Sequence, residues 1–245
     1  MITQTISQVI PPQYSGNKRI EALREQYIQD YSIDQYKIPK IDEEHDILAA
    51  MVYDECPPET NNIIQQSYEY FIEHLIAQYN MLVKHGYKFY PSLIQYPDSA
   101  SMIAELAVNK EISYLPVYAT DSIDDTHLMM EQAGVQDSQG NHLVANEVFR
   151  CVHDALAHSA GYSFGFTGEK GAWLIHRSCL PKESHLALWN ETRGQNSWTN
   201  AGPHMRKPDG KGFYTLLKAG EPGFLKLSER PFPYQKTVIA PDEFI

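Results

Sequence analysis

Cysteine is scarce in this chain, which has three in 245 residues, namely Cys56, Cys151 and Cys179. An odd number of cysteines without close spacing excludes a disulfide scaffold and a cysteine-rich zinc knuckle. So few thiols are typical of proteins in a reducing compartment, and we therefore expect the chain in the cytoplasm.

Long apolar runs are also missing. No stretch approaches the roughly 18 consecutive apolar residues of a membrane-spanning helix, so we expect no membrane contact. Residues 1–19 have no basic start followed by an apolar run, so we expect no secretory signal.

Basic residues are too few for a nucleic-acid surface. The chain has 20 Lys and Arg against 31 Asp and Glu, a formal net charge of −11. Proteins that bind nucleic acid through phosphates need a basic face, so we expect no direct nucleic-acid binding. One local group of basic side chains is interpreted as a solvated loop: Arg193, His204, Arg206, Lys207 and Lys211.

The composition indicates a globular protein, because 42% of the residues are hydrophobic and 11% are aromatic. Apolar residues at helical spacing predict a mainly α fold, in the α+β class with minor extended structure, as a single compact helical domain. We expect an irregular N-terminal arm over residues 1–45 with one short helix at 20–31. Residues 46–245 are predicted to form one metal-binding catalytic domain with an irregular C-terminal tail after Gly202.

Helices of that domain are predicted at 60–85, from Asp98 or Ser99 onward, and at 146–157, 169–179 and 182–193. Glycines follow three of them and are expected to end them, at Gly86, Gly161 and Gly194. Residues 87–96 and 112–118 contain prolines and are predicted to be extended. Residues 119–145 are predicted to be a long loop, with a helical turn near 127–132.

The densest group of chemically active side chains lies between Asn146 and Trp198. His153, Asp154 and His158 fall on one predicted helix. A helix advances by about 100° per residue, so Asp154 and His158 share a face, whereas His153 and His158 are about 140° apart. Both histidines reach one ion only if the helix widens into a π-bulge or ends there.

We predict a metal ion bound by His153, His158 and Glu191, because a carboxylate from a later helix completes a 2-His-1-carboxylate site. Such a site holds Fe²⁺ with open coordination positions, and Zn²⁺ or Mn²⁺ are alternatives. The alternative in which Asp154 rather than His153 shares the ion with His158 stays open.

Three further side chains are assigned catalytic roles. Asp154 is predicted to orient a ligand or carry a proton, and His176 and Gln195 to serve the substrate pocket. Glu169, beside Lys170, is interpreted as solvated.

Part of the chain resembles a family of proteins common in phages and prophages. The shared motifs read FRxVHDxxxH at 149–158, GExxAW at 168–173 and ETRGQNSW at 191–198. The resemblance extends from about residue 60 to Gln235 and Lys236. It implies a viral or mobile-element origin, hence the host cytoplasm, but no activity.

The order of His153, His158 and Glu191 is also similar to the iron-binding pattern of the aromatic amino acid hydroxylases. That resemblance implies that these three residues bind iron. This chain has Asp154 and Ala157 where that family has Glu and Gly, and the local match covers about 40 residues. It therefore implies nothing about substrate or pterin.

The leading hypothesis is a metal-dependent enzyme, a mononuclear non-haem Fe(II) oxygenase or hydroxylase acting on a small polar, aromatic or nucleotide-like substrate. A metal-dependent phosphohydrolase is the alternative, because the dipeptide His153-Asp154 is central to HD-type enzymes. Such a site needs an upstream histidine, His127 or His142, and a downstream aspartate, which no predicted helix provides before Asp209. A third hypothesis is a non-enzymatic phage protein that binds a host protein.

Overall fold

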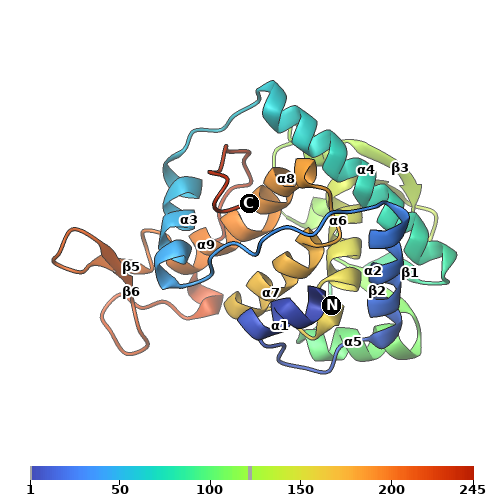
Figure 1. The fold of residues 1–245 in the computed structure, drawn as a ribbon, viewed down its shortest axis with the longest axis horizontal. Helices are drawn as coiled ribbons and strands as arrows, with labels where there is room; N and C mark the ends of the chain where they lie inside the picture. The colour runs from blue at the N-terminus through green and yellow to red at the C-terminus, as the bar shows by residue number, and fades with distance from the viewer. Residues whose placement is uncertain (1, 121–122) are drawn as a thin grey trace.

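The computed structural model describes residues 2–120 and 123–245, a mainly helical fold with short two-stranded sheets (Figure 1). This confirms the predicted mainly α, α+β class. Met1 of the predicted arm, and Asp121 and Ser122 of the predicted long loop, lie outside the described residues. None of the helices in the described ranges has a stretch apolar and long enough to cross a lipid bilayer.

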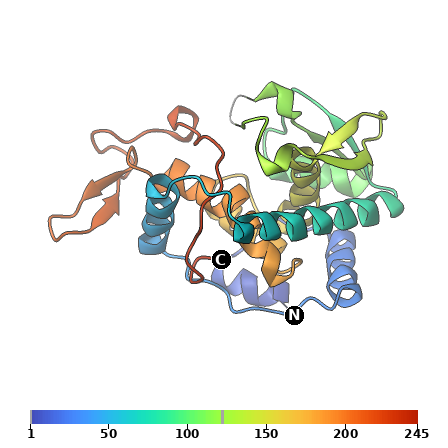
Figure 2. The same cartoon turned by 90° about the horizontal axis from the view of Figure 1, so that it is seen from above.

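Three helices form the centre: α4 (Asn62–Lys84), α6 (Ala145–Leu156) and α7 (Phe166–Arg177). α4 crosses the molecule as one long helix and packs against α6, which in turn packs against α7 (Figure 2). The buried stripe of α4 follows the predicted three-to-four-residue spacing: Ile64, Tyr68, Phe71, Leu75, Tyr79 and Leu82. The predicted helices at 60–85 and 146–157 are thereby confirmed.

The N-terminal segment belongs to the core. It contains α1 (Ile2–Val9) and α2 (Lys18–Asp30), followed by α3 (Glu43–Glu55). α2 confirms the predicted helix at 20–31. The side chains of Ile6, Ile10, Ile20 and Tyr27 are buried in the main apolar cluster or beside it. Residues 1–45 were expected to be a peripheral arm, and this burial of large apolar side chains corrects that expectation.

The helix predicted to stop at Gly194 continues beyond it. The chain runs through a 3₁₀ turn, η4 (Lys182–Ser184), then α8 (His185–Trp189), a π-helical turn, η5 (Asn190–Gly194), and α9 (Gln195–Ala201). Gly194 has a helical φ of −61°. A Cβ there would lie 2.6 Å from the Tyr53 ring, so this glycine permits close packing rather than ending the helix.

The strands are short and peripheral. β1 (Lys88–Pro91) pairs in parallel with β2 (Glu111–Tyr114), with α5 (Ser99–Val108) between them in sequence. The two predicted extended segments and the helix between them are confirmed, whereas their parallel pairing was not predicted. The predicted loop at 119–145 holds the turns η1 (Val117–Ala119, at its edge) and η2 (Leu128–Met130). It also holds an unpredicted antiparallel pair, β3 (Gln132–Gln136) and β4 (His142–Val144).

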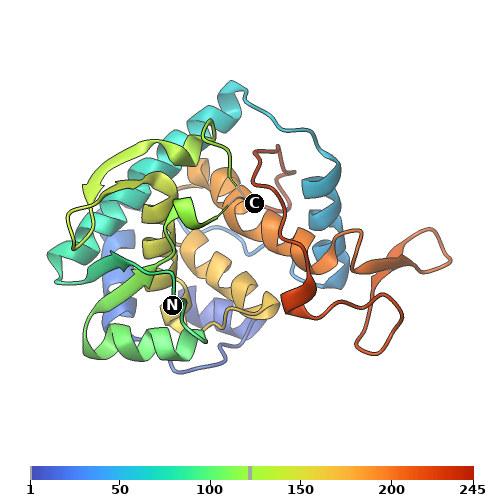
Figure 3. The same cartoon turned by 180° about the vertical axis from the view of Figure 1, so that it is seen from behind.

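The C-terminal part is mostly irregular, as predicted. A hairpin of β5 (Arg206–Pro208) and β6 (Tyr214–Leu216) projects from the body, and a 3₁₀ turn, η6 (Leu227–Glu229), follows (Figures 1 and 3). The last residues then return across the helices. Gln235 and Val238 are buried there, which places the tail beside α4 and η5.

Candidate metal centre

His153 and His158 come together where α6 ends. α6 stops at Leu156, and His158 begins the 3₁₀ turn η3 (His158–Ala160). The two imidazole rings lie edge to face with centroids 5.1 Å apart. Gly161 closes the turn at a φ of +103°, where a Cβ would lie 2.2 Å from the Tyr14 carbonyl oxygen. The helix end thus removes the 140° separation of a regular helix.

Glu169, in the first turn of α7, supplies the carboxylate beside the two histidines. One ligand atom from each of His153, His158 and Glu169 lies within 4.8 Å of the other two. His158 Nε2 is 3.5 Å from Glu169 Oε1. Two ligands of one ion with bonds of about 2.1 Å lie at most about 4.2 Å apart, so side-chain shifts of roughly half an ångström complete the set.

The hydrogen bond of His158 leaves its outer nitrogen free for a ligand. His158 Nδ1 lies 3.0 Å from the Tyr162 carbonyl oxygen, which can only accept, so Nδ1 carries the hydrogen. The neutral ring therefore has its lone pair on Nε2, facing Glu169. A metal-binding histidine usually has its other nitrogen bonded in this way.

A chain of hydrogen bonds fixes the tautomer of His153. Gln78 Nε2 donates to the Cys179 carbonyl oxygen at 2.9 Å, which orients its amide. Gln78 Oε1 then accepts from His176 Nε2 at 3.1 Å, so His176 Nδ1 accepts from His153 Nδ1, also at 3.1 Å. His153 Nε2 is left with a lone pair and is buried without a hydrogen-bond partner in the part of the chain that the structure describes.

Burial and charge act differently on the two histidines. Burial, assisted by the nearby His158 and His176, lowers the pKa of His153 well below its usual value, so this imidazole is neutral. Burial also opposes the charged form of His158, but the carboxylate of Glu169 outweighs it and raises the pKa of His158 to about 9. Without an ion, a proton thus balances Glu169, and a bound cation would replace it.

Asp154 lies beside the centre but outside the ligand group. Burial and the charge of Glu169 raise its pKa to about 6, against the opposing effect of His158. Its side chain is partly exposed, and no hydrogen bond to either histidine occurs in the described ranges. Of its two predicted roles, orientation of a ligand is therefore not seen, and proton transfer stays a prediction.

The centre opens toward solvent on the Glu169 side. The side chain of Glu169 is 18% exposed, whereas that of His158 is 2% exposed. The partly exposed Asn196 donates to Glu169 Oε2 at 3.5 Å. Phe164 packs edge to face on His158, and Phe149 packs on His153. Aromatic rings thus flank the histidines, and polar groups border the opening.

Comparisons with known proteins give no match. No protein-family model, curated protein or solved structure is similar enough to this chain to be matched. The chemistry of the centre therefore has to follow from its own residues.

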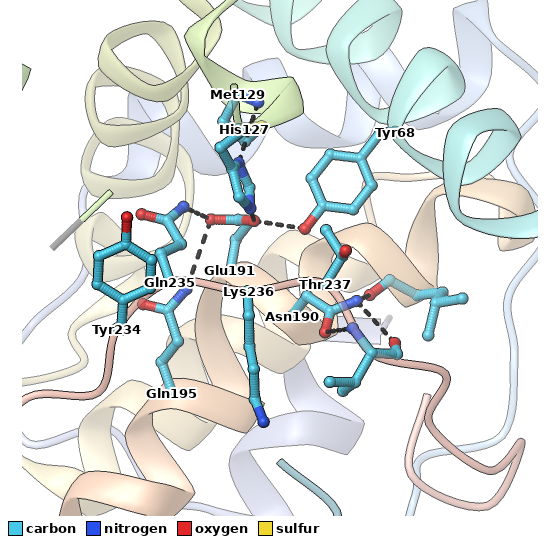
Figure 4. Close-up of polar contacts among 12 residues, drawn as sticks. Tyr68, His127, Met129, Asn190, Glu191, Gln195, Tyr234, Gln235, Lys236 and Thr237 are labelled. Carbon is cyan, nitrogen blue, oxygen red and sulfur yellow. Dashed lines mark hydrogen bonds and ion pairs between the residues drawn. The ribbon is translucent and has the colours of Figure 1, made fainter. Parts of the chain in front are cut away.

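Glu191, the carboxylate predicted to bind the metal, lies in another cluster (Figure 4). It accepts hydrogen bonds from Tyr68 at 2.5 Å and from Gln235, and it lies 3.7 Å from His127 Nε2. The π-helical turn η5 aims it at α4 and the C-terminal tail. The structure thus groups Glu169, not Glu191, with the histidine pair.

The other predicted side chains divide between the two clusters. Gln195 donates to Glu191 at 3.5 Å, so it belongs with that carboxylate rather than with the histidines. His176 contacts His153 but is fully buried, and burial lowers its pKa to about 3. It therefore holds His153 in place instead of contacting a substrate.

The sequence did contain a signal that Glu169 faces the same side of its helix as a buried histidine. Glu169, Trp173 and His176 recur at helical spacing, which places Glu169 on the same face of α7 as His176. The neighbouring Lys170 suggested a solvated pair, but Lys170 turns to Asp46 at 2.7 Å. Lys170 therefore does not pair with Glu169, whose carboxylate faces the histidines.

Neither histidine considered for the phosphohydrolase alternative lies in the metal centre. His127 faces Glu191, and the exposed His142 contacts Gln136 at 3.0 Å. The basic group expected to be a solvated loop is split, because Arg193 is buried against Asp46 at 2.6 Å.

Proposed function

We propose that this chain is a metal-dependent enzyme whose mononuclear centre is formed by His153, His158 and Glu169, and that it is a non-haem Fe(II) oxygenase or hydroxylase. The observation that supports this most directly is the convergence of three ligand atoms within 4.8 Å. The unpartnered Nε2 of buried His153 adds to it, because a buried nitrogen lone pair without a donor indicates a missing partner.

Once a bound cation has replaced the proton of His158, two neutral imidazoles and one carboxylate match the ligand set of mononuclear Fe(II) oxygenases, in which the metal supplies open positions for oxygen and substrate. His153 and His158 would hold the ion rigidly, because each has its second nitrogen in a buried hydrogen bond. Glu169 would be the adjustable ligand at the solvent side. The partly exposed Phe164 beside His158 favours a substrate with an apolar or aromatic part.

Hydrolysis with Zn²⁺ or Mn²⁺ is the second candidate function. The partly exposed Asp154, with its pKa raised to about 6, is suited to accept a proton from water beside the centre. His₂Glu is also a catalytic zinc ligand set. The phage origin and the small polar, aromatic or nucleotide-like substrate stay predictions under either candidate.

Metal analysis of protein purified without a histidine tag tests the proposal. About one iron per chain, lost in His153→Ala, His158→Ala and Glu169→Ala, together with substrate-dependent oxygen consumption, is the expected result. Zinc or manganese, with phosphate release from nucleotides, would favour hydrolysis. Protein that binds none of these metals after reconstitution would overturn both and favour a non-enzymatic binding protein.

A further inference from the structure

A cavity of about 470 Å³ lies between the start of α4, the turn before η2 and the C-terminal tail. Its wall includes Pro58, Asp124, Leu128 and Tyr234. This volume is in the range of about 300–1,000 Å³ that is typical of small-molecule sites. His127 and Gln235 also belong to the wall, and behind them lies Glu191 (Figure 4).

The Glu191 carboxylate is an acceptor buried deep behind this wall. Its side chain is 1% exposed, and burial raises its pKa. It accepts hydrogen bonds from neutral donors on three elements: Tyr68, Gln195 and Gln235. No Lys or Arg within the described ranges pairs with it. Its position on the π-helical turn η5 is typical of functional sites.

His127 faces Glu191 with an unused donor. Its Nδ1 accepts from the backbone N–H of Met129 at 3.2 Å, so the neutral ring carries its hydrogen on Nε2. The side chain is 6% exposed, and Nε2 has no hydrogen-bond partner among the described residues, with Glu191 Oε1 3.7 Å away. This tautomer has no Nε2 lone pair for a metal. The Nε2–H group instead needs a partner that accepts a hydrogen bond.

A hydroxyl group can form hydrogen bonds with both His127 and Glu191. Its oxygen accepts from His127 Nε2–H, while its own hydrogen is donated to Glu191. An ammonium group would leave the His127 hydrogen without an acceptor, and a phosphate or carboxylate would meet the Glu191 charge. The ligand would reach the carboxylate by displacing the Gln235 amide, which lies between it and the cavity.

The outer part of the cavity fits a polyhydroxylated ring. Hydrogen bonds from Thr126 lower the pKa of Asp124, which is therefore a carboxylate acceptor at the rim. Lys236 Nζ turns away, to the carbonyl oxygens of Asp54 and Cys56. Tyr234 is 56% exposed as a residue, and its ring offers an aromatic face. The cavity thus presents acceptors and a flat apolar wall, and its described wall residues offer no free cation for an anionic ligand.

We propose that this cavity is a second ligand site, which binds an uncharged polyhydroxylated ring, either a monosaccharide or the ribose of a nucleoside. One hydroxyl lies beside the 3.7 Å gap between His127 Nε2 and Glu191 Oε1, within hydrogen-bond reach of both. A second hydroxyl bonds Asp124, and the ring packs on Tyr234. The site shares no ligand residue with the metal centre. It therefore goes beyond the proposed function, and each of the two proposals can be tested without the other.

Saturation-transfer NMR at millimolar ligand concentration tests this site with four probes: glucose, adenosine, 2′,3′-dideoxyadenosine and AMP. Binding of glucose would assign a sugar site, and binding of adenosine a nucleoside site. In the second case dideoxyadenosine should bind at least about tenfold more weakly, because it lacks both ring hydroxyls that would bond His127, Glu191 and Asp124. AMP should also bind more weakly than adenosine.

Asp124→Asn and Glu191→Gln should each weaken the bound probe, while Asp125→Asn, an exposed neighbour outside the cavity wall, should not. Metal content should be unchanged in all three, and Glu169→Ala should leave probe binding intact. The proposal is overturned if neither glucose nor adenosine binds, if adenosine binds but dideoxyadenosine binds equally well, or if Asp124→Asn has no effect. The dideoxyadenosine comparison uses the wild-type protein, and Asp124 is an exposed residue. Both tests therefore remain valid even if Glu191→Gln fails to fold.

Discussion

The position of the hydrogen on the His153 imidazole is set by residues that are not metal ligands themselves. Its Nε2 lone pair is available because His176 accepts from Nδ1, and His176 can accept because Gln78 takes its other hydrogen. The Gln78 amide is oriented in turn by the Cys179 carbonyl oxygen. A glutamine on α4 thus decides which nitrogen of a histidine on α6 carries a hydrogen.

Replacement of Gln78 by methionine tests this relay. Gln78→Met removes the acceptor for His176 Nε2–H, so the tautomer of His153 is no longer fixed. We expect metal affinity, measured by competition with a chelator, to fall about 10–100-fold, as for other residues that orient metal ligands.

The control is Gln66→Met, an exposed position on the same helix, which should leave the affinity unchanged. Thermal unfolding of the metal-free variants shows whether the fold is retained. A folded Gln78→Met protein with wild-type metal affinity would show that the relay has no role.

At the scale of elements, the sequence predicted regular helices well and irregular ones poorly. The apolar stripe of α4 and the Asp98 N-cap of α5 were visible because spacing and caps are local signals. The π-helical turn η5 was not visible, because close packing of Gly194 on Tyr53 is a tertiary contact. That turn aims Glu191 at Tyr68, and the sequence therefore indicated the wrong carboxylate for the histidine pair.

Three elements meet at one buried ion cluster. Asp46 on α3 bonds Lys170 on α7 at 2.7 Å and Arg193 on η5 at 2.6 Å. Asp46→Asn would leave two buried cations without a counter-charge. We expect a loss of about 3–5 kcal/mol in the free energy of unfolding, measured by urea denaturation.

Glu44→Gln, an exposed carboxylate on the same helix, serves as the matched control and should change stability by less than about 0.5 kcal/mol. A similar small effect for Asp46→Asn would mean that the cluster does not hold α3, α7 and η5 together.

At the scale of the whole molecule, buried neutral histidines make stability depend on pH. His185 shows this away from the metal centre: Nε2 donates to the Leu180 carbonyl oxygen, and Nδ1 is buried with no hydrogen-bond partner in residues 2–120 and 123–245. Burial, with a further effect from Arg177, lowers its pKa from 6.5 to about 3. The unfolded chain therefore takes up the proton first, and stability is lost as the pH falls from about 6.5 toward 3.

His185→Gln should reduce that loss by about 1.4 kcal/mol per pH unit below 6.5. The measurement is the free energy of unfolding between pH 7 and pH 5. The exposed His142→Gln should keep the wild-type slope. Equal slopes for all three proteins would show that His185 does not resist protonation in the folded state.

Cobalt(II) titration, followed by visible absorption, tests most directly which carboxylate completes the metal centre. One Co²⁺ per chain should bind to the wild-type protein and to Glu191→Gln with similar affinity, because Glu191 lies in another cluster. Glu169→Gln should bind it far more weakly, because the ligand atoms of His153 and His158 then lose their carboxylate. Retention of Co²⁺ in Glu169→Gln together with its loss in Glu191→Gln would contradict this account.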